Sequence, residues 1–120
     1  MTQGYRYAVV LACSIMVYGL SSLSQFVSAA DGDATKGKSS FQARCVGCHG
    51  PSGKGDGPIG KKMKPPAPDF TSAASKAKSQ GELRNIIENG IPKTAMKAWK
   101  TQLTEAEIQN VLAYVLTLRE

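Results

Sequence analysis

The sequence CVGCH at residues 45–49 constrains this chain more than any other feature. It places two cysteines three positions apart, and His49, the only histidine of the 120 residues, follows the second cysteine directly. Cysteines at this spacing occur in thioredoxin-like redox pairs, in structural zinc sites, in disulfides and at covalently attached haem groups. The rest of the sequence discriminates among these four chemistries.

Three of the chemistries fit the chain poorly, although they remain alternatives. A thioredoxin-like pair lies between a strand and a helix, and the sequence shows no alternating strand pattern. Structural zinc usually takes four ligands from two separated pairs, whereas this motif offers two thiols and one imidazole. A disulfide between Cys45 and Cys48 is compatible with an oxidising compartment but leaves His49 without a role.

Covalent haem attachment gives each residue of the motif a function. Cys45 and Cys48 can each form a thioether with a vinyl group of the same porphyrin. The adjacent His49 is then held beneath the centre of the ring, where its imidazole can coordinate the iron. The motif therefore predicts one haem c, bound through both cysteines, with His49 as an iron ligand.

The first thirty residues have the layout of a secretory signal peptide. Arg6 precedes an apolar segment over residues 7–20, which is shorter than the roughly 20 residues of a membrane-spanning helix. The first thirty residues turn polar after this segment and end on the small residues Ala29 and Ala30, which are typical of a cleavage site. We therefore expect residues 1–30 to be a signal peptide.

The expected mature chain, residues 31–120, is a single periplasmic domain without a membrane span. Lipid attachment at Cys13 is an alternative to release by cleavage. A domain of this size has a marginal core and usually needs a metal, a cofactor or disulfides to stabilise it. A bound cofactor is consistent with this need.

The domain sequence predicts three helices joined by long loops, over residues 33–45, 79–90 and 104–118. Asp33 is a candidate N-cap of the first helix, and Thr104 begins a capping box at the start of the last. The connections are rich in glycine and proline and are long for so small a domain. Such loops are expected where they enclose a ligand.

The segments CVGCHGPSGKGDGPIG, PPAPDF and LTEAEIQNVLAYVLTL resemble bacterial class I c-type cytochromes. The resemblance covers about residues 33–119 and implies an all-α, small cytochrome c fold. Its three main helices and long loops would wrap around one covalently bound haem. Gly37 and Phe41 match the family's glycine and aromatic residue where the first and last helices cross, and Tyr114 matches the aromatic residue of the last helix.

The same resemblance implies a set of residues around the iron. His49 matches the proximal ligand, and Pro58 matches the proline whose carbonyl accepts the N–H of that imidazole. Met96 matches the methionine of the family's ligand loop, although Lys97 stands where proline is usual. Met63 is the alternative methionine ligand, and an open sixth position is a third possibility.

Histidine and methionine together fill both axial positions of the iron, which suits an electron carrier and argues against an enzyme. We expect a periplasmic, monomeric one-electron carrier that serves respiratory or photosynthetic redox partners. The alternatives are a haem enzyme or small-ligand sensor with a labile sixth ligand, and a fixed cytochrome subunit of an oxidoreductase complex.

The chain is basic, with a formal net charge of +6. Six lysines on two loops are expected to surround the haem edge and attract an acidic docking surface. They are Lys61, Lys62, Lys64, Lys93, Lys97 and Lys100. Nucleic acid is not an expected partner, because no stacking aromatic residues are set among the basic ones.

Overall fold

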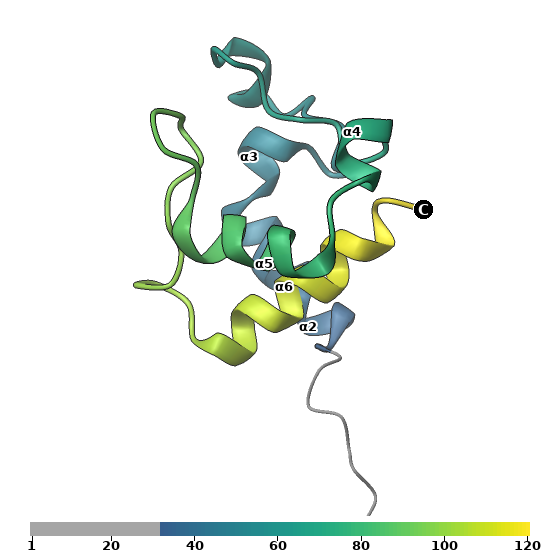
Figure 1. Cartoon of the computed structure of the whole chain (residues 1–120), viewed down its shortest axis with the longest axis vertical. Helices are drawn as coiled ribbons and strands as arrows, with labels where there is room; N and C mark the ends of the chain where they lie inside the picture. Colours follow the sequence, from purple (N-terminus) through teal and green to yellow (C-terminus); the bar gives the residue numbers. More distant parts are fainter. Residues whose placement is uncertain (1–31) are drawn as a thin grey trace, which may run out of the picture.

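The computed structural model describes residues 32–120, so the predicted signal peptide lies outside the described residues. The described part of the chain contains five α-helices and one short 3-10 helix, and no strand. The helices are α2 (Ala34–Arg44), α3 (Val46–His49), η1 (Gly60–Lys62), α4 (Ala73–Lys76), α5 (Gln80–Asn89) and α6 (Glu105–Thr117). The predicted all-α fold is confirmed, and α2, α5 and α6 are the three main helices (Figure 1).

The first predicted helix is α2, and Asp33 caps it as expected. The Asp33 carboxylate accepts hydrogen bonds from the backbone N–H groups of Thr35 and Lys36. These bonds satisfy two of the four backbone donors that have no partner inside the first turn of a helix. Gly37 and Phe41, one turn apart, are the buried residues of α2.

The first and last main helices pack directly against each other (Figure 1). A Cβ atom built on Gly37 would overlap the carbonyl oxygen of Asn110 in α6, so this approach requires glycine. The Asn110 side chain also accepts a hydrogen bond of 2.7 Å from the backbone N–H of Asp33. Phe41 and Tyr114 meet edge to face at the same contact, with ring centroids 5.3 Å apart.

The other two main helices begin with capping boxes. Ser79 and Glu82 form the box of α5, and Thr104 and Glu107 form the box of α6. In each box the hydroxyl of the cap residue accepts a hydrogen bond from the backbone N–H of the glutamate. The glutamate carboxylate in turn accepts one from the backbone N–H of the cap residue. Because these signals are local, the starts of both helices could be predicted correctly from the sequence.

The hydrophobic core joins the three main helices to the long connections. Its central side chains are almost completely inaccessible, with Phe41 1% and Val111 2% exposed. The full cluster is Phe41, Phe70, Leu83, Ile87, Trp99, Leu103, Ile108, Val111, Leu112 and Val115. Because Phe70 and Trp99 lie in connections, the loops contribute to the core as well as the helices.

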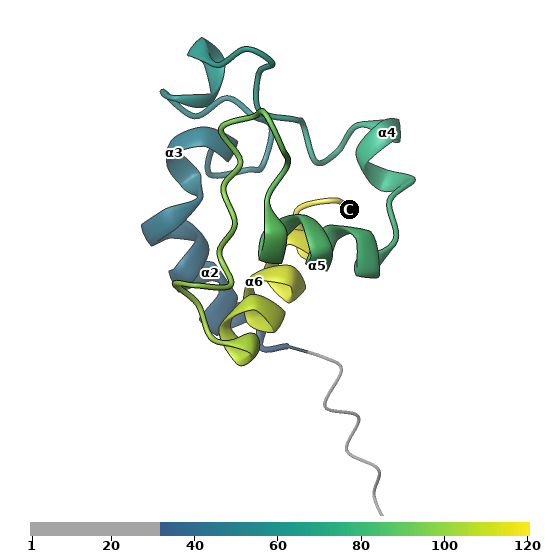
Figure 2. The ribbon, with the colours of Figure 1, turned by 60° about the vertical axis from the view of Figure 1, so that its left-hand side comes forward.

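Three short helices were not expected from the sequence. They are α3, η1 and α4, of three or four residues each. Each is too short to display a helical repeat of apolar residues, which is the signal used to predict the main helices. In Figure 2 the connection between α3 and α4 runs across the top of the molecule, above α5 and α6.

Candidate functional site

The short helix α3 brings the CVGCH residues together. Cys45 lies between α2 and α3, and the backbone N–H of His49 donates to the Cys45 carbonyl at 3.0 Å. Residues three and four apart share one face of a helical turn, so Cys45, Cys48 and His49 present their side chains to the same side. Both thiols are unbridged and half-buried.

The imidazole of His49 is held between aromatic side chains. Its centroid lies 4.8 Å from that of Phe70 and 6.4 Å from that of Phe41. Burial lowers the pKa of His49 below its usual value, because the charged imidazolium loses solvation. A neutral imidazole is the form that binds a metal ion.

One nitrogen of this imidazole has an unusual environment. Nδ1 of His49 is buried and has no hydrogen-bond partner among the described residues. An unpaired buried polar group costs about 1–3 kcal/mol, so its presence calls for an explanation such as a functional role. Pro58 is exposed, and the expected hydrogen bond from Nδ1 of His49 to its carbonyl is not formed in this structure, so the role of Pro58 at the site stays a prediction.

The Cys45 thiol also has a shifted pKa. Burial raises it to about 11, and the nearby Arg44 offsets only part of this effect. The thiol is therefore protonated at neutral pH, and ordinary thiolate chemistry is suppressed.

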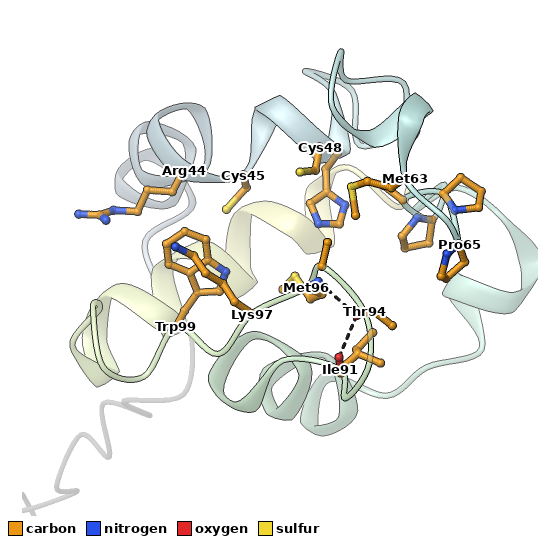
Figure 3. Close-up of a pocket in the computed structure, with 15 residues that line it drawn as sticks. Arg44, Cys45, Cys48, Met63, Pro65, Ile91, Thr94, Met96, Lys97 and Trp99 are labelled. Atoms are coloured by element: carbon orange, nitrogen blue, oxygen red, sulfur yellow. Dashed lines mark hydrogen bonds between the residues drawn. The ribbon is translucent and has the colours of Figure 1, made fainter.

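Two adjoining cavities lie beside the motif, with volumes of about 260 Å³ and about 200 Å³. We call the first the outer cavity, because Cys48, Met63, residues 65–67 and the exposed Lys97 border it (Figure 3). We call the second the inner cavity, because core side chains such as Leu83, Ile87, Val111 and Val115 line it.

Six residues line both cavities and therefore mark the boundary between them. They are Cys45, His49, Pro68, Ile91, Met96 and Trp99. Met63 lines only the outer cavity, so the two candidate methionines are not equivalent. The structure thus brings together Cys45, Cys48, His49 and Met96 around one apolar space.

The loop that carries Met96 follows α5 and contacts the core through Trp99. The backbone N–H of Trp99 donates to the Ile87 carbonyl at 3.1 Å. The ammonium group of Lys97 lies 4.5 Å from the centroid of the Trp99 ring, a cation–π contact. Lys97, which replaces the expected proline, is thus held against the neighbouring aromatic residue.

These features fit a covalently bound haem. The two thiols lie on the wall of an apolar space, a half-buried imidazole with a lowered pKa lies beside them, and a thioether lies on the same boundary. In haem c two cysteine thioethers attach the porphyrin to the chain, and a histidine and a methionine bind the iron. Fold and site together define a haem-binding protein of the c type.

Comparison with known proteins identifies the family. The cytochrome c family profile matches residues 34–119, and the chain belongs to this family as a class I, monohaem c-type cytochrome. Membership assigns the chain to haem-based electron transfer and implies covalent haem c. The resemblance inferred from the sequence is confirmed.

Two curated relatives support this assignment. The chain is 37% identical over 92 residues to a cytochrome c6 of Rippkaea orientalis, covering 74% of this chain and 74% of the relative. It is 32% identical over 95 residues to cytochrome c-554(547) of Halothiobacillus neapolitanus, covering 73% of this chain and 99% of the relative.

Two solved structures are also similar. One is a chain of the Kuenenia stuttgartiensis reducing HAO-like protein complex, with a TM-score of 0.61 and 25% identity. The match covers 69% of this chain but only 41% of that chain. The other is the KustC0563 c-type cytochrome, with a TM-score of 0.55, 27% identity, and coverage of 69% of this chain and 93% of that chain.

The sequence pointed to the motif but missed residues that shape the site. Phe70, which packs on His49, belongs to the PPAPDF segment but was not assigned to the site. Phe70 is the aromatic residue that ends a proline-rich loop, and this position is the signal that could have identified it.

Among the described residues, no helix is long and apolar enough to cross a membrane.

Proposed function

We propose that this protein is a periplasmic one-electron carrier whose haem c is attached through Cys45 and Cys48 and ligated by His49 and Met96. The observation that carries the proposal is that His49 and Met96 border the same two cavities, whereas Met63 borders one. Bound here, a haem supplies an iron that alternates between the ferric and ferrous states. Core side chains around the inner cavity would exclude water from it.

With His49 and Met96 both bound to the iron, no position would remain open to a substrate, so the protein would act as a carrier. A thioether ligand favours the ferrous state and raises the reduction potential. The second candidate from the sequence, an enzyme or small-ligand sensor, requires that Met96 leave the iron readily. The two functions therefore differ in how firmly Met96 is bound.

The outer cavity is the proposed site of electron exchange. Arg44 and Lys97 line it, and Ile91, which is 40% exposed, lies at the same boundary. An apolar patch beside positive charges suits a partner with an acidic docking surface. Lys61, Lys62 and Lys64 are carried by the neighbouring η1 connection.

A fixed subunit of a larger complex is a further candidate function. The observation in its favour is the similarity to a chain of the reducing HAO-like protein complex. Co-purification at moderate salt concentration distinguishes the two: a carrier elutes as a monomer, and a subunit elutes with its complex.

The experiment that tests the proposal uses the full chain expressed with a c-type cytochrome maturation system. The periplasmic protein should weigh one haem more than its polypeptide, and acid–acetone should fail to extract the haem. Its ferric form should show the weak long-wavelength band that marks methionine-ligated iron in this family, and a titration should show one single-electron step. Extractable haem would contradict covalent attachment, and a missing band would favour the enzyme or sensor.

A further inference from the structure

The chain around Met96 is closed into a small loop by its own backbone. The N–H of Ile91 donates to the carbonyl of Met96 at 2.9 Å. Gly90, which ends α5, has φ +70°, and a Cβ atom there would lie 2.5 Å from the Met96 carbonyl oxygen. The carbonyl of Met96 is therefore fixed against the end of α5, and only glycine permits this approach.

A tight turn lies inside this loop. The N–H of Thr94 donates to the Ile91 carbonyl at 3.2 Å, which defines a four-residue turn with Pro92 and Lys93 in its centre. Lys93 has φ +62°, a left-handed conformation that disfavours residues with a Cβ atom. A turn of this kind favours proline at the position of Pro92 but usually places glycine or asparagine at that of Lys93, so its sequence stabilises it only in part.

The Thr94 side chain adds two hydrogen bonds to this turn (Figure 3). Its hydroxyl donates to the Ile91 carbonyl at 2.8 Å and accepts from the backbone N–H of Met96 at 3.2 Å. Met96 is thus held at both of its backbone polar groups, through Thr94 on one side and Ile91 on the other. Thr94 is half-buried and lines the outer cavity together with Met96.

We propose that Thr94 is a positioning residue that keeps Met96 in place as the iron ligand. This inference rests on the proposed function, in which Met96 provides the sixth ligand. The turn restricts the backbone before Met96. After Met96, Lys97 stands in place of the expected proline, and its ammonium group lies over the Trp99 ring. The hydroxyl acts on the loop and needs no contact with the cofactor.

The test compares variants of the haem-loaded full chain under conditions in which each is fully folded. Thr94→Val keeps the shape of the side chain and removes the hydroxyl, and Thr94→Ala serves if valine does not fold. Thr94→Ser keeps the hydroxyl. Thr117→Val is the matched control, because the Thr117 hydroxyl also donates to a carbonyl three residues earlier, that of Tyr114, at 2.7 Å.

The measured quantity is the affinity of the ferric protein for imidazole, which competes with Met96 for the iron. Loss of the two bonds should raise this affinity about tenfold in Thr94→Val, the ratio that corresponds to 1.4 kcal/mol. The long-wavelength methionine band should weaken at the same time. Thr94→Ser should stay within about twofold of the native protein, and Thr117→Val should leave the affinity unchanged, because a general loss of stability does not act on the ligand.

Met96→Ala separates this inference from the proposed function. If Met96→Ala abolishes the methionine band while Thr94→Val changes neither band nor imidazole affinity, the positioning role is wrong and the ligand assignment stands. The role is also wrong if Thr117→Val shows the same increase in affinity as Thr94→Val. If Met96→Ala leaves the band intact, the ligand assignment fails and the role of Thr94 fails with it.

Discussion

At the scale of single residues, the site depends on where two chemically identical side chains lie. Met63 and Met96 are the two methionines of the described residues, and both border the outer cavity. Only Met96 also reaches the inner cavity. Its backbone is fixed by hydrogen bonds to Ile91 and Thr94, and those bonds restrict where the thioether can point.

Met96→Ala should remove the methionine band and lower the reduction potential, because a thioether ligand favours ferrous iron. The iron should become high-spin or take an external ligand, and peroxidase activity should increase. Absorption spectra and a redox titration of the haem-loaded protein measure these changes.

Met63→Ala is the matched control for that substitution. It should leave the band and the potential unchanged. Because Met63 is only partly buried, the substitution should lower the free energy of unfolding by less than the roughly 2–5 kcal/mol typical of a buried methionine. The reverse pattern, with the band lost in Met63→Ala and kept in Met96→Ala, would mean that Met63 is the ligand.

At the scale of elements, the contact between α2 and α6 determines the position of the motif. Cys45 directly follows the last residue of α2, so any shift of that helix shifts the attachment site. Arg84 on α5 donates to Glu88 on the same helix and to Glu105 on α6, which ties the second pair of main helices together. Exposed pairs of this kind usually contribute at most about 1 kcal/mol. Close backbone packing at Gly37 is therefore the more demanding requirement.

Gly37→Ala tests that requirement, with Gly81→Ala as its control. Alanine is favoured over glycine by roughly 1 kcal/mol inside a helix. A Cβ atom at Gly81 would meet only the Ser79 hydroxyl, at an ordinary contact distance of 4.0 Å, so Gly81→Ala should raise the melting temperature. At Gly37 it overlaps the Asn110 carbonyl, so Gly37→Ala should lower the free energy of unfolding by about 1–3 kcal/mol.

Thermal unfolding followed by circular dichroism measures both variants. In a domain of this size each kcal/mol corresponds to a shift of roughly 4–8 °C. Equal increases in melting temperature for Gly37→Ala and Gly81→Ala would show that the crossing of α2 and α6 tolerates a side chain.

The features predictable from the sequence were those encoded locally. The Asp33 cap, the two capping boxes and the apolar periods of α5 and α6 each lie within a few neighbouring residues. The cysteines and His49 are contiguous, so their grouping was equally accessible. The packing of Phe70 on His49 could not be predicted from the sequence, because a hydrogen bond from the N–H of Phe70 to the Gly53 carbonyl brings distant loop segments together.

The same limit applies to the loop around Met96. The sequence suggested a methionine ligand through resemblance, but the bonds of the Thr94 hydroxyl depend on the conformation of a turn with an unfavourable residue, Lys93, at its left-handed position. Locally, Pro92 favours this turn and Lys93 disfavours it, and packing of Gly90 against Met96 supports it.

At the scale of the whole molecule, the positive charge should govern encounters with partners. The formal net charge is +6, and Arg44 and Lys97 border the outer cavity. Attraction between oppositely charged molecules raises association rates and weakens as salt screens it. Screening is strong at about 1 M salt, where the Debye length is about 3 Å, and weak at about 0.01 M, where it is about 30 Å.

Oxidation by an anionic metal complex should therefore slow as salt increases, and oxidation by a cationic complex should accelerate. Stopped-flow absorbance of the reduced protein measures both rates. Replacing Lys61 and Lys62 by Glu should reduce or reverse the salt dependence with the anionic complex. A double variant on α2, with Lys36 and Lys38 replaced by Glu, should do so less, and equal effects would indicate that only the total charge matters.

The contact between α2 and α6 also has a consequence for biogenesis. These helices are the first and last main elements of the described chain, and the CVGCH motif follows directly on the first. Under the proposed export, the polypeptide crosses the membrane N-terminal end first, so Cys45 and Cys48 emerge before α6. The inner wall, which includes Val111 and Val115, does not yet exist at that stage. The direction of transport would thus allow thioethers to form on an open chain, before the last helix arrives and encloses the site.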